Sequence, residues 1–170
     1  MNVQHSSRTD QWGTPSHILG MAREVLGQIT FDPASSWEFN DNVQAARYWT
    51  KDGLTGPWPV GETIWCNPPG GKSGNRSMAA LFWNRLVNTH IRHAMFMAFS
   101  LEQMQTTQSS AKSILDFPVC VPRRRIAFIR PDGSTGPAPS HSNVIVYVPG
   151  SLDMTDKFLS VFSKLGAVKR

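Results

Sequence analysis

Apolar residues recur at the spacing of an amphipathic helix in several stretches of the chain. The clearest stretch follows the start signal Thr14-Pro15-Ser16 and ends at Gly27. Its apolar positions, which fall one, three and four residues apart and so share one helix face, are Ile18, Leu19, Ala22, Val25 and Leu26. The pattern indicates further helices over residues 37–45, 78–88, 101–115 and 153–165.

Short apolar runs bounded by Gly, Pro, Asn or Asp predict strands between these helices. They cover residues 28–31, 46–50, 62–66, 93–99, 119–129 (interrupted by Pro122) and 144–148. The run 93–99 is apolar almost throughout, which is typical of a central strand covered on both faces. Because strands alternate with helices and a pair of strands closes the chain, the pattern predicts a three-layer α/β domain with a mixed sheet.

The length of 170 residues fits one domain, with residues 1–13 as a polar N-terminal arm. No apolar run is long enough to span a membrane, and residues 1–10 lack the apolar core of a signal peptide, so we expect a cytoplasmic protein. Cys66 and Cys120 are expected to be reduced and buried. Neither cysteine nor any of the five histidines has metal-ligand spacing, so no metal is expected.

The tripeptide Asn67-Pro68-Pro69 directly follows predicted strand 62–66, at the edge of the sheet where open α/β folds bind ligands. An amine on an aromatic ring is a poor nucleophile because its lone pair is delocalised, so an enzyme must accept its hydrogens. An Asn side-chain oxygen and a Pro backbone carbonyl can do this together, and the prolines hold those carbonyls in fixed directions. The alternative is that the tripeptide is only a turn that ends the strand.

Several motifs in the same order resemble the phage DNA N6-adenine methyltransferase family, often called Dam-like. They are Asp10-Gln11-Trp12-Gly13-Thr14-Pro15, Phe31-Asp32-Pro33-Ala34-Ser35-Ser36 with Asn40, Tyr48-Trp49-Thr50, Asp52-Gly53-Leu54, and Trp58 with Asn67-Pro68-Pro69. The similarity is strong over about the first 70 residues and less specific over residues 123–128 and 142–147.

The resemblance implies a compact class I, Rossmann-like methyltransferase that moves a methyl group from S-adenosylmethionine to adenine N6 in double-stranded DNA. It implies that the protein acts in the host cytoplasm if a bacteriophage encodes it. The implied catalytic residues are Asn67, Pro68 and Pro69, and the implied cofactor-binding residues are Trp12, Thr14, Pro15, Asp32, Pro33, Ala34, Ser35 and Asp52. Asp32 carries a charge suited to the ammonium or sulfonium group of the cofactor, but Asp before Pro is also a common helix N-cap.

One departure from the family concerns the position after Asn-Pro-Pro. Family members usually have an aromatic residue there, which stacks on the flipped base, whereas this chain has Gly70. Phe82, Trp83 and Trp65 are nearby rings, although such residues more often belong to the core. Two alternatives stay open. One is a cytosine N4 methyltransferase, since the same Asn-Pro-Pro geometry can activate either amine and Gly70 changes the base pocket, and the other is a catalytically silent, basic DNA-binding relative.

The formal net charge of +5 favours a polyanionic partner, although many basic proteins bind no nucleic acid. We interpret Lys72, Arg76 and the run Arg123-Arg124-Arg125 as contacts to the DNA backbone, with ordinary solvated surface as the alternative. In a strand over 119–129, Arg123 and Arg125 would share one face and Arg124 the other. Gly71-Lys72-Ser73 does not complete a phosphate-binding loop, because Cys66 stands where that motif requires Gly.

No separate recognition domain is visible in the sequence, so we expect the target sequence to be read by loops at 70–77, 103–113 and 130–142. Whether the protein is a monomer or a dimer stays open.

Overall fold

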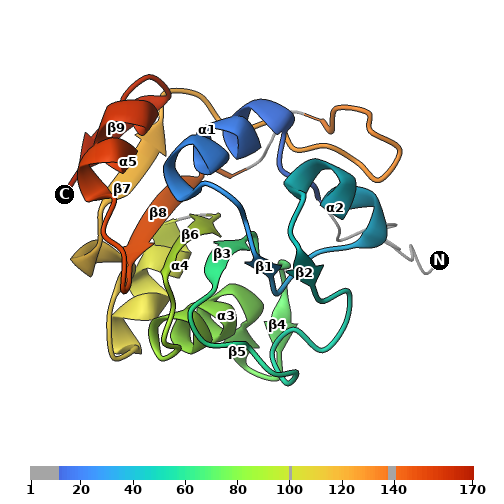
Figure 1. The fold of residues 1–170 in the computed structure, drawn as a ribbon. Helices are drawn as coiled ribbons and strands as arrows, with labels where there is room; N and C mark the ends of the chain where they lie inside the picture. Colours follow the sequence, from blue (N-terminus) through green and yellow to red (C-terminus); the bar gives the residue numbers. More distant parts are fainter. Residues whose placement is uncertain (1–11, 100, 138–140) are drawn as a thin grey trace.

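The computed structural model of the protein describes residues 12–99, 101–137 and 141–170. Of the polar arm predicted for residues 1–13, Trp12 and Gly13 are described, while Asp10 and Gln11 of the first motif lie outside the described residues. Figure 1 shows strands β3 (Thr63–Cys66) and β6 (His93–Ala98) in the middle of the fold, with helices above and below them.

The described strands form one mixed sheet and one small hairpin. The sheet also contains β1 (Phe31–Asp32), β2 (Arg47–Tyr48), β7 (Val119–Pro122), β8 (Val144–Pro149) and β9 (Gly166–Lys169). Its order is β2-β1-β3-β6-β8-β7-β9. The four neighbouring strands β2, β1, β3 and β6 run parallel to one another. The remaining pairs, β6–β8, β8–β7 and β7–β9, are antiparallel. The hairpin pairs β4 (Lys72–Ser73) with β5 (Arg76–Ser77).

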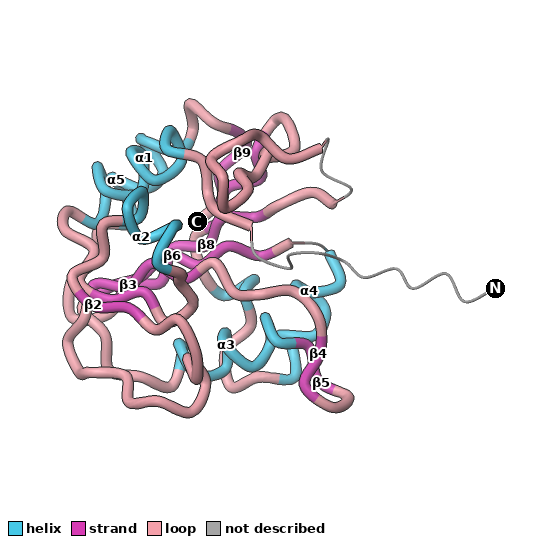
Figure 2. Tube along the Cα trace, turned by 90° about the vertical axis from the view of Figure 1, so that its right-hand side faces the viewer, coloured by secondary structure: helices cyan, strands magenta, loops and turns pink. Residues whose placement is uncertain are grey.

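Helices cover both faces of the sheet, which confirms the predicted three-layer α/β domain. Helices α1 (Ser16–Leu26), α2 (Trp37–Val43) and α5 (Thr155–Phe162) lie on one side, and α3 (Met78–Val87) and α4 (Leu101–Thr106) lie on the other (Figure 2). Alternate residues of the central strands point to opposite faces of the sheet. On one face Trp65, Met95 and Met97 pack with α1 and α5. On the other face Ile64, Cys66 and Phe96 pack with α3. Among the described residues, no helix is both long and apolar enough to cross a membrane.

His93 ties several elements of the first layer together. Its ring is fully buried, with Nδ1 3.2 Å from the Tyr147 hydroxyl and Nε2 3.2 Å from the Leu26 carbonyl oxygen. Burial lowers the pKa of His93, which favours the neutral ring. The same Tyr147 hydroxyl accepts a hydrogen bond of 2.7 Å from the Met154 N–H, just before α5. The interactions link α1, β6, β8 and α5.

The predicted helix over 101–115 is wrong in its second half. Helix α4 ends at Thr106 and is followed by two short 3-10 turns, at Thr107–Ser109 and Ile114–Asp116. The Thr106 hydroxyl donates to the Gln103 carbonyl oxygen at 3.2 Å and the Ser109 hydroxyl to the Thr106 carbonyl oxygen at 2.8 Å. Hydroxyls that bond nearby carbonyls in this way compete with regular helix formation.

The predicted strand over 119–129 is also too long, because β7 ends at Pro122. Proline has no N–H for the ladder, and the next N–H, that of Arg123, donates to the Leu165 carbonyl oxygen at 3.1 Å. Strand β9, which follows α5 and pairs with β7, was not predicted.

Candidate active site

The carboxyl ends of β1, β3 and β6 border a cleft of about 780 Å³. Its walls come mainly from residues 34–39, 49–55, 67–72 and 102–106, together with Phe99. A volume of this size lies within the usual range for small-molecule sites, and the carboxyl edge is where open α/β sheets bind ligands.

Asn67 follows the last residue of β3 and lines this cleft. Its Nδ2 group donates to the Trp12 carbonyl oxygen and to the Thr14 hydroxyl oxygen, each at 3.2 Å. Its Oδ1 atom is buried and has no hydrogen-bond partner among the described residues. An acceptor in this state is costly for a protein to keep. Trp65 and Asn143 also have buried polar atoms without a partner among the described residues, but of the three only Asn67 lines the cleft, where a ligand can supply the donor.

Pro68 and Pro69 continue the chain along the cleft and fix its direction. Pro68 is buried and Pro69 is half-buried, and both line the cleft next to Asn67. Gly70 is exposed, and a Cβ atom placed there would meet no atom within 4 Å. The site therefore has open space at the position after the second proline.

The turn after β1 forms the wall on the other side. Asp32 is 2% exposed, and its Oδ1 atom accepts a hydrogen bond of 2.9 Å from the Ala34 N–H. Burial raises the pKa of Asp32 to about 7, and the hydrogen bonds from Ala34 and Ser35 act in the opposite direction. Ala34 and Ser35 line the cleft, whereas Asp32 and Pro33 lie behind them.

The N-cap interpretation of Asp32 is wrong, because helix α2 has a different cap. The Ser36 hydroxyl oxygen accepts a hydrogen bond of 3.2 Å from the Phe39 N–H, and Ser36 holds the N-cap position. The buried Asp32 carboxyl is therefore not needed to begin the helix.

The loop containing Asp52 is held tightly against this turn. Asp52 is exposed, lines the cleft and has a φ of 57°. A Cβ atom on the next residue, Gly53, would lie 1.9 Å from the Pro33 carbonyl oxygen, so only glycine fits. The Trp49 N–H donates to the Asp32 carbonyl oxygen at 3.0 Å, which joins the two segments again.

Arg85 on α3 supports the same loop, and sequence reasoning did not single it out. Its guanidinium donates to the backbone carbonyls of Leu54 and Gly56, and it lies 5.1 Å from the centre of the Trp58 ring. Burial lowers the pKa of Arg85. Nothing in the sequence could have identified this contact, because its acceptors are backbone atoms about 30 residues earlier.

The N-terminal motif is divided between the cleft and its support. Trp12 lines the cleft, Thr14 is buried and bonds Asn67, and Pro15 is buried at the start of α1. Gly13 exchanges two backbone hydrogen bonds of 2.9 Å with Ile129. The predicted cofactor residues Trp12, Ala34, Ser35 and Asp52 thus share one cleft with Asn67, while Thr14, Pro15, Asp32 and Pro33 lie behind its surface.

The rings considered for base stacking mostly belong to the core. Trp65 and Trp83 are fully buried and do not line the cleft, and Phe82 lines it but is only 3% exposed. Among the described residues, the aromatic side chains that line the cleft are Trp12, Phe39, Trp49, Phe82 and Phe99.

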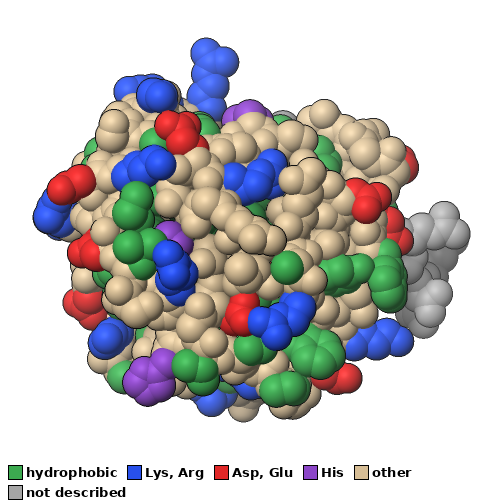
Figure 3. All heavy atoms as spheres, in the orientation of Figure 1, with side chains coloured by type: hydrophobic (Ala, Val, Ile, Leu, Met, Phe, Trp, Pro, Cys, Tyr) green, Lys and Arg blue, Asp and Glu red, His purple; other side chains and the backbone are tan. Residues whose placement is uncertain are grey.

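The basic residues predicted to contact DNA lie in two places, on the β4–β5 hairpin and after the end of β7. Lys72 and Arg76 are exposed on the β4–β5 hairpin, and Lys72 lines the cleft. On the face seen in Figure 3, Lys and Arg side chains are scattered among acidic and uncharged ones rather than gathered over one element.

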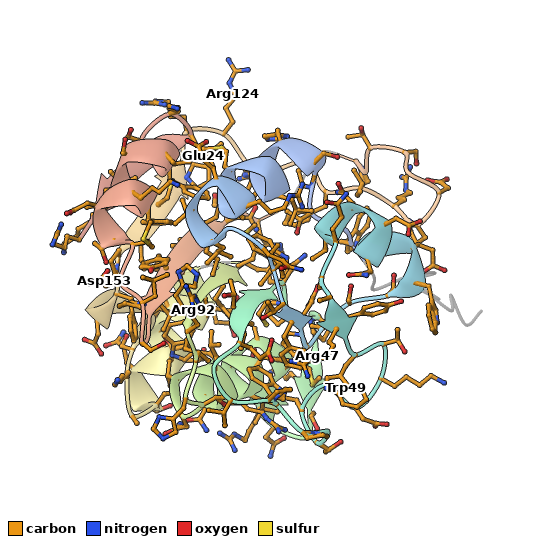
Figure 4. All side chains as sticks on the ribbon, in the orientation of Figure 1. Glu24, Arg47, Trp49, Arg92, Arg124 and Asp153 are labelled. Atoms are coloured by element: carbon orange, nitrogen blue, oxygen red, sulfur yellow. The ribbon has the colours of Figure 1, made fainter. Side chains whose placement is uncertain are left out.

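The arginine run follows β7, so the predicted strand alternation of its side chains is wrong. The Arg123 guanidinium donates to the carbonyl oxygens of Lys164 and Ser163 at 3.0 and 3.4 Å, where it binds the end of α5. The Arg124 side chain projects away from the molecule, as Figure 4 shows. Arg125 is exposed. None of the three lines the cleft.

Comparison with known proteins agrees with this arrangement. The chain matches the family of DNA N-6-adenine-methyltransferase (Dam) over residues 2–160. No curated protein and no solved structure gave a match. The mixed, helix-covered sheet is consistent with a Rossmann-like methyltransferase fold. Because the match spans nearly the whole chain, the protein belongs to the DNA N-6-adenine-methyltransferase (Dam) family.

Proposed function

We propose that the protein transfers a methyl group from S-adenosylmethionine to the exocyclic N6 amine of an adenine in double-stranded DNA. The observation that carries the proposal is the buried, unpartnered Oδ1 atom of Asn67 in the cleft. The family match independently supports adenine N6 as the target.

The Asn67 amide is oriented before any substrate arrives. The Trp12 carbonyl oxygen can only accept a hydrogen bond, so the amide must present Nδ2 to it and Oδ1 to the opposite side. Oδ1 and the backbone carbonyl oxygen of Pro68 would then accept the two hydrogens of the adenine amine. These two hydrogen bonds would localise the lone pair on the amine nitrogen. Because both acceptors are already oriented, they need no rearrangement during the reaction.

The residues around the Asp32 turn fit a positively charged cofactor. When bound, S-adenosylmethionine supplies an electrophilic methyl group. Ala34 and Ser35 would let the backbone approach its methionine part, and Asp52 would accept hydrogen bonds from its ribose or adenine groups. A buried carboxyl such as Asp32, whose pKa is raised to about 7, becomes an anion readily when a cation binds close by.

Contacts to the DNA backbone would come from exposed cations around the cleft. Lys72 lines the cleft beside the catalytic tripeptide, and Arg76 follows it across the hairpin. Arg124 and Arg125 lie past the end of β7, whose carboxyl end is at the same edge of the sheet as those of β3 and β6. These cations would hold the phosphates of a duplex while one base enters the cleft.

The test is incubation of the purified protein with tritiated S-adenosylmethionine and unmodified DNA, followed by mass spectrometry of the nucleosides. The expected product is N6-methyladenine, which is absent when Asn67→Ala replaces the wild-type protein. N4-methylcytosine instead would assign the cytosine reaction. Absence of any methylated nucleoside, with measurable DNA binding, would favour a silent relative.

A further inference from the structure

A base that leaves the DNA stack needs a flat apolar surface in the enzyme to replace its former neighbours. Gly70, which follows the two prolines, has no side chain to provide one. Of the cleft-lining rings, Phe82 and Phe39 are nearly buried, at 3% and 8% exposure. The Trp49 Nε1–H donates to the Pro57 carbonyl oxygen at 3.2 Å, so that ring is held in the loop over the Asp32 turn.

Phe99 is half-buried, as Trp49 and Trp12 are, but among the described cleft-lining rings it alone lies at the end of β6, next to the strand that carries Asn67. In the parallel pairing of β3 with β6, Cys66 lies opposite Phe96. The pairing ends with this residue pair, and both chains leave the sheet at the same edge, with Asn67 directly after β3 and Phe99 directly after β6. Phe99 thus lines the same cleft as the tripeptide Asn67-Pro68-Pro69, although 30 residues separate it from Pro69 in the sequence.

Asn67 and Phe99 also contact the same small structure, formed by residues 12–14 and 128–129. Asn67 bonds the Trp12 carbonyl oxygen, and Gly13 pairs with Ile129. The rings of Phe99 and Phe128 have their centres 5.8 Å apart at an angle of 44°. Both side chains therefore lie on the side of the sheet that this pair of segments covers.

The surroundings of Phe99 hold the ring in place. The Phe99 N–H donates to Oε1 of Gln103 at 2.6 Å, which fixes the backbone, while Phe128 supports the ring. Phe99 is only half-buried, and it lines the cleft that Asn67, Pro68 and Pro69 also line. A ring that is fixed at one side and open at the other can receive a base without prior rearrangement.

We propose that Phe99 is the ring on which the target adenine stacks, and that it performs the role for which Gly70 has no side chain. The inference rests on the proposed function, because it assumes that a base enters the cleft. Phe99 would bind the substrate base and take no part in proton or methyl transfer. Its contribution should therefore depend on the presence of a flat ring and not on a particular polar group.

The experiment compares ring-keeping and ring-removing variants on a defined duplex. The methylated site is first mapped on plasmid DNA treated with the wild-type protein, and oligonucleotides that contain it are then used for single-turnover kinetics. Phe99→Leu should slow transfer roughly 10- to 100-fold, since stacking of one base on an aromatic side chain is worth about that much. Phe99→Tyr and Phe99→Trp should stay within about threefold of wild type, because they keep the ring.

Two further measurements separate stacking from packing. Phe117→Leu is the control for lost packing, because Phe117 is a half-buried ring outside the cleft whose centre lies 5.4 Å from that of Trp83. Phe99→Leu and Phe117→Leu should have the same affinity for S-adenosylmethionine and the same melting temperature. An abasic site opposite the target adenine removes its pairing partner, so this duplex should recover several-fold of the Phe99→Leu defect.

Each contrary result has a separate meaning. If wild-type protein transfers no methyl group to DNA, the proposed function fails and this inference fails with it. If wild type is active and Phe99→Leu is equally fast, or if Phe99→Tyr and Phe99→Trp are as slow as Phe99→Leu, the stacking role alone is overturned. A ring-specific loss in Trp12→Leu combined with normal transfer by Phe99→Leu would overturn it as well.

Discussion

The Nδ2 group of Asn67 lies 3.2 Å from the carbonyl oxygen of Trp12, a residue 55 positions earlier in the chain. The bond joins the end of a central strand to the segment that precedes the first helix, and it leaves Oδ1 as the amide's unused atom. The orientation of the Asn67 amide therefore depends in part on a backbone atom, and an exchange of the Trp12 side chain would not remove that acceptor.

Replacing Asn67 by Ala should lower the rate of methyl transfer at least about 100-fold, because an acceptor for the developing charge is removed. The affinity for S-adenosylmethionine should stay within a few-fold, which calorimetry measures. Asn88→Ala is the control, since Asn88 is exposed at the end of α3 and does not line the cleft. Near-normal turnover by Asn67→Ala would contradict the catalytic assignment.

Replacing Thr14 by Val keeps the shape of the side chain but removes the hydroxyl oxygen that accepts from Asn67. The Trp12 carbonyl still holds the amide, so a partial effect is expected. Transfer should slow roughly three- to tenfold, the equivalent of one neutral hydrogen bond. Thr14→Ser, which keeps the acceptor, should be close to wild type in the same single-turnover assay. Equal rates of methyl transfer for Thr14→Val and Thr14→Ser would show that the Thr14 hydroxyl does not orient Asn67.

The Asp32 carboxyl should make both stability and cofactor affinity depend on pH. Its pKa is about 7 in the folded protein against an ordinary value of 3.8. Between these pH values the folded protein keeps a proton that the unfolded chain has released, so the free energy of unfolding falls as the pH rises from about 4 to about 7. Denaturant titrations at several pH values should show this slope, and Asp32→Asn should reduce it.

Cofactor binding should have the opposite dependence. A cation near Asp32 favours the carboxylate, so the affinity for S-adenosylmethionine should increase between about pH 6 and pH 8, with release of a proton. Calorimetry in buffers of different ionisation heat measures that proton. An affinity and proton count unchanged in Asp32→Asn would remove Asp32 from cofactor binding.

Gly53→Ala should weaken cofactor binding about tenfold or more and lower the melting temperature, because the new methyl group would collide with the Pro33 carbonyl oxygen. The loop with Asp52 would have to move away from the turn at Asp32. Gly20→Ala is the matched control: Gly20 is exposed within α1 with nothing within 4 Å of its Cβ position, so this change should be neutral or stabilising. Normal affinity in Gly53→Ala would show that this close approach is not needed.

The basic residues should separate into DNA contacts and a helix contact. Replacing Lys72 and Arg76 together by Ala should reduce the slope of log affinity for DNA against log salt by about 0.9 for each phosphate that the protein no longer binds. Arg123→Ala should instead lower the melting temperature, because its guanidinium binds carbonyls after α5. Fluorescence anisotropy at several salt concentrations checks the first expectation. A salt slope that changes only in Arg123→Ala would reverse the two assignments.

The elements that sequence reasoning located correctly have strong local signals. Helix α1 has five buried apolar residues on one face, and β6 is buried along its whole length and apolar after His93. The position of Asn67 followed from the same logic, since a strand that runs into two prolines must end there. The three-layer arrangement followed from the alternation of these elements.

What the sequence did not reveal depends on contacts between distant segments. Strand β9 is only four residues long, and its one fully buried residue is Gly166, so no apolar pattern marks it. Residues 101–116 have few apolar positions, and local hydroxyl bonds decided their conformation. The place of Phe99 could not be predicted without the register of β3 and β6, because nothing in a single strand says which neighbour it will have.

The order of strands in the sheet has a consequence for the synthesis of the protein. Strand β7 does not pair with β6 but with β8 and β9, and β8 (residues 144–149) lies between β6 and β7. A ribosome must therefore release the chain beyond residue 149 before the centre of the sheet can close, and the partner of Gly13, Ile129, also emerges late. A chain interrupted during translation would lack these supports of Asn67, so methylation of DNA would begin only with nearly full-length molecules.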